Sequence, residues 1–69
     1  MKSIEIQITA DEKTIVSRLA KGEKAEDIAA DLSVASGTFA NTMKAIRAKY
    51  GVKNTVELVA YFLREGIIK

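Results

Sequence analysis

Four basic residues lie close together in the second half of the chain, in a segment that contains no acidic residue. They are Lys44, Arg47, Lys49 and Lys53. Neither Asp nor Glu occurs between Leu32 and Val56, whereas the rest of the chain holds seven basic and nine acidic residues. Clustered ammonium and guanidinium groups bind nucleic-acid phosphates and release their condensed counterions. The segment therefore predicts a phosphate-binding surface, with a plain solvated helix face as the alternative.

The residue types that carry most enzyme chemistry are missing from this sequence. It contains no His and no Cys, which removes the usual proton shuttle, the thiol nucleophile, disulfides and structural zinc sites. The remaining Ser, Thr, Lys, Tyr and carboxylate side chains show no recognisable catalytic spacing. We therefore predict that the protein is not an enzyme and binds no cofactor, metal or small-molecule ligand.

The composition is that of one small helical domain. The chain has 69 residues, of which 48% are hydrophobic, with four glycines and no proline. A core of this size is only marginally sufficient and benefits from a partner. No apolar run approaches the roughly 18 residues of a membrane span, and no signal-peptide apolar block is present. We therefore expect an all-α, cytoplasmic protein with no membrane partner.

The N-terminus alternates between apolar and polar residues. Ile4, Ile6 and Ile8 have the period of a short strand, but no partner strand is evident in the sequence. We therefore expect residues 1–8 to form a short extended arm and residues 9–69 to form the folded domain.

Capping signals and glycines divide that domain into four expected helices. The first begins near Ala10, because Thr9 and Glu12 have the spacing of a capping box, and it ends before Gly22. Apolar residues at helical spacing predict three more helices over residues 25–32, 36–50 and 55–65, with Gly51 ending the third and Asn54 capping the fourth.

The second and third expected helices are joined by only a few residues, which is typical of a helix-turn-helix. The apolar stripe of the third helix comprises Phe39, Met43, Ile46 and Tyr50. The opposite side carries Asn41, Lys44, Ala45 and Ala48, with Ala40 and Arg47 beside them. Small residues allow close approach to DNA, and Asn and Lys hydrogen bond to base edges. The pattern predicts that this helix enters the major groove of double-stranded DNA.

Short motifs along the chain are specific in their combined order and spacing. They are Ile8–Glu12, Leu19–Gly22, Asp27–Val34, Thr38–Phe39, Lys49–Asn54, and Glu57 with Val59. Through these motifs the segment from Ile8 to Ile68 resembles the C-terminal DNA-binding domain of LuxR/GerE-type (NarL-like) transcription regulators. The resemblance implies a four-helix DNA-binding domain that usually dimerises through its fourth helix.

The resemblance and the charge pattern together predict the residues that contact DNA. They are Lys24, Ser36, Thr38, Ala40, Asn41, Lys44, Arg47, Lys49, Lys53 and Thr55. For Thr38 the alternative is a local helix cap, and for Asn41 it is an ordinary exposed side chain.

The sequence departs from the family pattern at the start of the third helix. The family commonly has a Ser or Thr cap followed by an acidic and a basic residue, where this chain has Ala35, Ser36 and Gly37. A frequent Lys is replaced by Ala40 and a frequent His by Thr42. Because Ala cannot cap a helix, we expect Ser36 to do so one residue later. The lost charge leaves a second function open, a protein-interaction module that pairs with another regulator.

The fourth expected helix is apolar over much of its circumference, more than a small core can bury. This surplus predicts a dimer surface at Val56, Tyr61 and Leu63, and the alternative is that Ile4 and Ile6 of the arm cover these residues. The leading hypothesis is a DNA-binding transcription regulator that acts as a homodimer, or as a heterodimer with another regulator. Whether it is a stand-alone protein or a fragment stays open.

Overall fold

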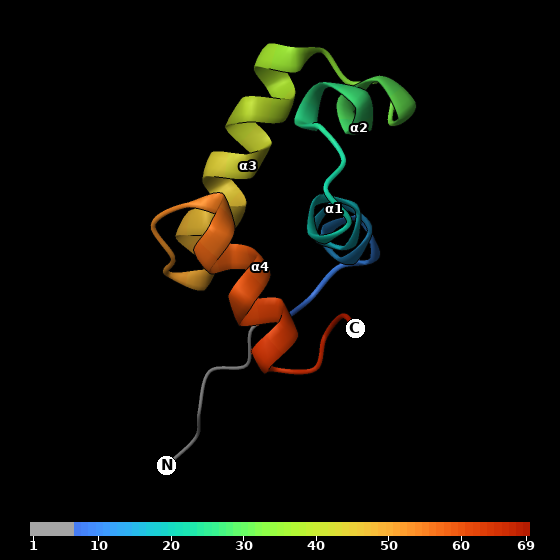
Figure 1. The fold of residues 1–69 in the computed structure, drawn as a ribbon. Coiled ribbons are helices and arrows are strands. Elements are labelled where there is room, and N and C mark those ends of the chain that lie inside the picture. The colour runs from blue at the N-terminus through green and yellow to red at the C-terminus, as the bar shows by residue number, and fades with distance from the viewer. Residues whose placement is uncertain (1–6) are drawn as a thin grey trace.

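The computed structural model describes residues 7–69, which contain four α-helices and no strand in that range. The helices are α1 (Ala10–Ala20), α2 (Ala25–Asp31), α3 (Ser36–Tyr50) and α4 (Thr55–Arg64), as Figure 1 shows. The predicted all-α class is therefore confirmed. Most of the expected arm, residues 1–6, lies outside the described residues, and Gln7 and Ile8 are exposed and non-helical.

Helix α1 begins where the sequence predicts, and the capping box is formed in full. The Thr9 hydroxyl accepts a hydrogen bond from the backbone N–H of Glu12 at 3.1 Å, and the Glu12 carboxylate accepts one from the N–H of Thr9 at 3.2 Å. Two of the free amides at the helix start are satisfied in this way.

Helix α3 begins without a side-chain cap. The expectation that Ser36 caps it is wrong, because Ser36 is already helical and Ala35 occupies the cap position. The Ala35 carbonyl accepts the first helical hydrogen bond, from Phe39 N at 2.8 Å. A missing cap costs about 1 kcal/mol, and a helical Gly37 costs about as much again. Tertiary packing of the buried Phe39 side chain therefore has to hold this end of the helix.

The turn between α2 and α3 contains a residue with left-handed backbone. Ser33 has φ 58°, and the Val34 N–H donates to the Ala29 carbonyl at 2.9 Å. This hydrogen-bond pattern ends α2 tightly and reverses the chain. A left-handed residue other than Gly or Asn is uncommon, so the backbone is strained here to set the direction of α3.

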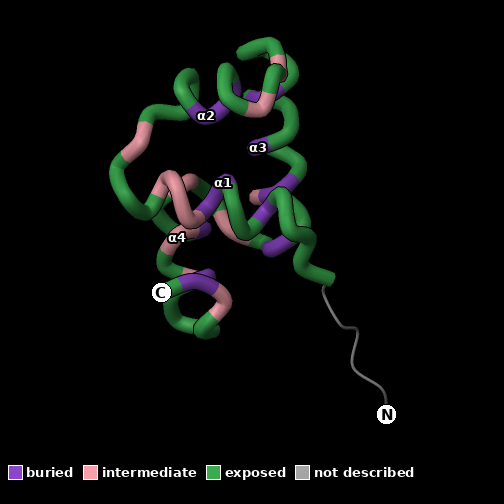
Figure 2. The backbone as a smooth tube through the Cα atoms, turned by 90° about the vertical axis from the view of Figure 1, so that its right-hand side faces the viewer, coloured by how far each residue is buried: buried purple, intermediate pink, exposed green. Residues whose placement is uncertain are grey.

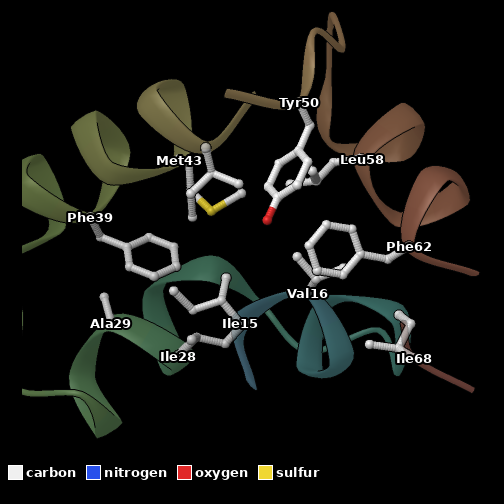
Figure 3. Packing of buried hydrophobic residues seen from close by; sticks show 11 residues of the cluster. Ile15, Val16, Ile28, Ala29, Phe39, Met43, Tyr50, Leu58, Phe62 and Ile68 are labelled. Carbon is white, nitrogen blue, oxygen red and sulfur yellow. The ribbon is translucent and has the colours of Figure 1, made fainter. Parts of the chain in front are cut away.

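The core lies between the four helices. Helix α3 packs against α2 near its start and against α4 near its end, while α1 contacts both α2 and α4. The most deeply buried large side chains are Val16, Ile28, Leu58 and Phe62. Figure 3 shows these side chains pointing toward one another from α1, α2 and α4, with Phe39, Met43 and Tyr50 of α3 closing the cluster. Ile68 folds back onto this core.

None of the four helices in residues 7–69 is long and apolar enough to cross a membrane.

Candidate nucleic-acid interface

Helix α3 has one buried and one exposed side, and Figure 2 shows both along its length. The buried side consists of Phe39, Met43, Ile46 and Tyr50. The opposite side consists of the exposed residues Gly37, Asn41, Lys44, Ala45 and Ala48. Since all five of these residues are exposed, the outward side is open along the whole helix.

The charge on α3 is confined to its second half. Lys44 is exposed and Arg47 is half-buried, and the helix contains no acidic residue. The first half, from Ser36 to Met43, carries no charged side chain at all. Basic groups near a helix C-terminus are also favoured by the helix dipole.

The structure gives Lys49 a structural role that the sequence analysis did not predict. Its ammonium lies 2.9 Å from Oε2 and 3.1 Å from Oε1 of Glu12, and it also donates to the Gln7 carbonyl at 2.5 Å. The Glu12 carboxylate neutralises much of this positive charge. Lys49 therefore links the end of α3 to the start of α1, and less of its charge faces outward than that of Lys44.

Glu12 is a buried carboxylate with three kinds of partner. Besides Lys49 and the Thr9 amide, it accepts a hydrogen bond from the Tyr50 hydroxyl at 2.5 Å. Burial on its own raises the pKa of Glu12, but the hydrogen bonds from Tyr50, Lys49 and Thr9 outweigh it, and the pKa lies below its ordinary value of 4.5. Burial and the bond to Glu12 raise the pKa of Tyr50. Glu12 is thus ionised at neutral pH and fastens α3 to α1.

A second ion-pair network joins α1 to α2. The Arg18 guanidinium lies 2.6 Å from Oε1 of Glu23 and 2.5 Å from Oδ2 of Asp31. Arg18 stands near the end of α1, and Asp31 is the last residue of α2. The network therefore helps to position α2 on α1, and through the tight turn at Ser33 it also orients the start of α3.

One of the predicted flanking residues, Thr55, lies beside Arg47 in a groove that the acidic Glu26 also lines. This shallow groove of about 390 Å³ is lined by residues of α2, α3 and the start of α4, among them Ala25, Arg47 and Thr55. The starts of α2 and α4 therefore lie on the same side of α3. The exposed Lys24 and Lys53 come directly before these two helices.

The hydroxyl groups near the start of α3 differ in whether they are free to bind a ligand such as DNA. The Thr42 hydroxyl donates to the Thr38 carbonyl at 3.0 Å, so its hydrogen is used within the helix. Thr42 also lines a small groove together with Asp11 and Ile15 of α1, on the edge of α3 that faces α1. Thr38 and Ser36 are exposed in the first turn of α3.

A separate apolar surface lies on α4. Val56 and Leu63 are 78% and 47% exposed, high values for such side chains. Together with Leu19, Ala20, Val59 and Ala60 they line a shallow groove of about 400 Å³ between α4 and the end of α1. We call these residues the α1–α4 apolar surface.

Tyr61, the third residue predicted for a dimer surface, is not part of the α1–α4 apolar surface. Its ring packs against Tyr50 with centroids 5.5 Å apart, and Arg64 lies 5.8 Å from its centroid. The structure therefore brings Val56 and Leu63 together and places Tyr61 at the edge of the core.

Comparison with known protein families gave one finding that bears on this geometry. The family model GerE, described as "Bacterial regulatory proteins, luxR family", matches residues 7–62. The matched segment runs from just before α1 to the last turn of α4, so it contains the helix-turn-helix and the residues that support it. No curated protein and no solved structure matched the chain.

Proposed function

The chain belongs to the luxR family of bacterial regulatory proteins, and from that premise we propose that it is a transcription regulator that inserts α3 into the major groove of double-stranded DNA. The observation that carries this proposal is the outward side of α3. It is exposed along its length, and α3 has no acidic residue. An α-helix with small and basic residues on its outer side fits the width of the major groove.

The predicted residues fall into groups that contact different parts of DNA. Lys44 and Asn41 project from the outward side of α3 toward base edges and the adjacent backbone. Arg47 and Thr55 line one groove beside α3, and we assign them, with Lys24 and Lys53 just before α2 and α4, to the phosphates of one strand. Ser36, Thr38 and Ala40 line the first turns of α3, where short side chains permit close approach. Lys49 contributes mainly by holding α3 in place.

The first prediction is that Lys44→Ala and Arg47→Ala each weaken binding to random-sequence duplex DNA by about 5- to 10-fold at low salt. Each variant removes one phosphate-neutralising group, so the slope of log K against log salt falls by about 1. The measurement is a titration by fluorescence anisotropy at low and moderate salt. Lys69→Ala is the matched control, because it removes the same charge from the C-terminus, which packs beside α1 rather than α3.

Absence of salt-dependent binding by the wild-type protein would contradict the DNA proposal. Equal weakening by Lys69→Ala would contradict the assignment to α3, because it would show that net charge alone controls binding. If the wild-type protein does not bind DNA, the main candidate for a functional surface becomes the α1–α4 apolar surface. The protein would then be an interaction module that pairs with another regulator.

We also propose that two copies associate through the α1–α4 apolar surface. The support is that Val56 and Leu63 are exposed on one side of α4 and continue into Leu19 and Ala20 of α1. Exposed apolar residues that form a continuous patch are typical of an interface. A two-fold dimer would present two α3 helices to successive half-sites of a palindromic DNA element.

Val56→Glu is expected to raise the dimer dissociation constant about 10-fold or more, because two carboxylates would be desolvated across a self-complementary contact. Analytical ultracentrifugation over a concentration series measures this change. Position 56 lies in the first turn of α4, where a carboxylate is favoured by the helix dipole, so the monomer stays folded. A wild-type protein that is monomeric at all concentrations would contradict the proposed dimer.

A further inference from the structure

We propose that Asn41 determines the sequence preference of this protein by binding an adenine, so that each half-site contains an A·T base pair opposite Asn41. This inference rests on the proposed function, since it names the base that α3 recognises once the helix is in the major groove.

Asn41 lies on the outward side of α3, directly opposite the buried stripe formed by Phe39, Met43 and Ile46. It is exposed, and it carries the one side-chain amide of this helix. The other Asn of the chain, Asn54, uses its amide oxygen to cap α4 by accepting from Glu57 N at 2.8 Å. Among the described residues, no side-chain hydrogen bond engages the Asn41 amide, so both its oxygen and its NH₂ group are available to a base.

The neighbours of Asn41 let the amide reach base edges. Gly37 precedes it by one turn and Ala45 follows it by one turn, and both are exposed. Gly37 has no side chain and that of Ala45 is a single methyl group, so neither holds the helix away from DNA. A short side chain such as Asn contacts base edges only when the backbone approaches closely, and these neighbours permit that approach.

The other polar side chains nearby are less suited to reading bases. Thr42 faces α1 and its hydroxyl hydrogen is bonded within the helix. Arg47, the side chain type that most often binds guanine, lies on the edge of α3 toward α2 and the start of α4. Lys44 is flexible and carries a single charged donor group, which binds phosphate as readily as a base. Asn41 is therefore the residue of α3 with the most directional base contact.

The amide group distinguishes adenine from the other three bases. In the major groove adenine presents the N7 acceptor beside the N6 donor, so an Asn amide donates to one and accepts from the other. Guanine presents two acceptors, N7 and O6, and one of them would face the amide oxygen. Cytosine and thymine each offer a single polar group there. Only adenine satisfies both halves of the amide with neither left unpaired.

The test is selection of binding sites from a random-duplex pool, followed by a thermodynamic cycle. Wild-type protein is expected to enrich sites with an invariant adenine in each half-site. Asn41→Ala is expected to lose the preference at that base pair alone, and Lys44→Ala to weaken all sites more evenly. In the cycle, the adenine is replaced by 7-deaza-adenine, which lacks the N7 acceptor but keeps Watson–Crick pairing.

The 7-deaza substitution is expected to weaken wild-type binding by about 10-fold. It is expected to leave the binding of Asn41→Ala unchanged within about 2-fold, because that variant already lacks the amide that would bond to N7. Alanine has higher helix propensity than Asn, so the variant stays folded. The inference would be overturned if the selected sites had a G·C pair at every position, or if Asn41→Ala kept the adenine preference of the wild type. Salt-dependent binding in the same experiment would still support the proposed function. Failure of the wild type to bind any duplex would overturn both.

Discussion

Phe62→Ala is expected to leave the protein largely unfolded at 25 °C. The Phe62 side chain is fully buried, and its ring packs edge-on against that of Tyr50 with centroids 5.2 Å apart. Removing such a ring from a core costs about 3–5 kcal/mol, through lost burial and the cavity left behind. A single core in a chain of this size supplies about 3–5 kcal/mol in total, so little stability would remain.

Circular dichroism with a urea titration measures this loss directly. The matched control is Leu63→Ala, which changes the next residue in α4 but at a side chain that is 47% exposed. At protein concentrations below dimer formation, we expect it to change the free energy of unfolding by less than about 1 kcal/mol. A Phe62→Ala variant as stable as this control would show that α4 does not pack on α1 and α3 as described.

The helix positions followed from local signals in the sequence. The capping box at Thr9 and Glu12 and the Asn54 cap place the starts of α1 and α4 where the structure has them. Local signals also mark helix ends. Gly51, for example, ends α3 with a left-handed backbone that most other residues disfavour. Helix α3 shows the limit of this reasoning. Its uncapped start depends on burial of Phe39 rather than on any residue beside it.

The interface was predicted less completely than the fold, because charge alone does not show what a side chain contacts. Lys44 and Lys49 look equivalent in the sequence, yet Lys44 is exposed and Lys49 is paired with Glu12. Glu12 and Lys49 are 37 residues apart, and no local pattern connects residues so distant. Tyr61 and Leu63 likewise look equivalent on an apolar helix, but in the structure Tyr61 packs on Tyr50 while Leu63 lines the groove beside α1.

The contact between Glu12, Tyr50 and Lys49 leads to the second large expected effect. Glu12→Gln is expected to lower the free energy of unfolding by about 2 kcal/mol at pH 7, because it weakens charge-assisted hydrogen bonds and leaves the Lys49 ammonium without its carboxylate. Tyr50→Phe, which deletes only the hydroxyl, is expected to cost about 1 kcal/mol and serves as the graded control.

The pH dependence distinguishes this ionised contact from ordinary packing. Because the pKa of Glu12 is lower in the folded protein than its ordinary value of 4.5, the folded state binds the proton less tightly than the unfolded chain does. The stabilisation is therefore complete above about pH 4.5 and is lost as the pH falls through the lower folded pKa. Urea titrations from pH 7 down to pH 3 should show the wild-type and Glu12→Gln curves converging. A gap that stayed constant over this range would mean that Glu12 acts through its shape and not its charge, and the end of α3 would then owe its position to the Tyr50 ring alone.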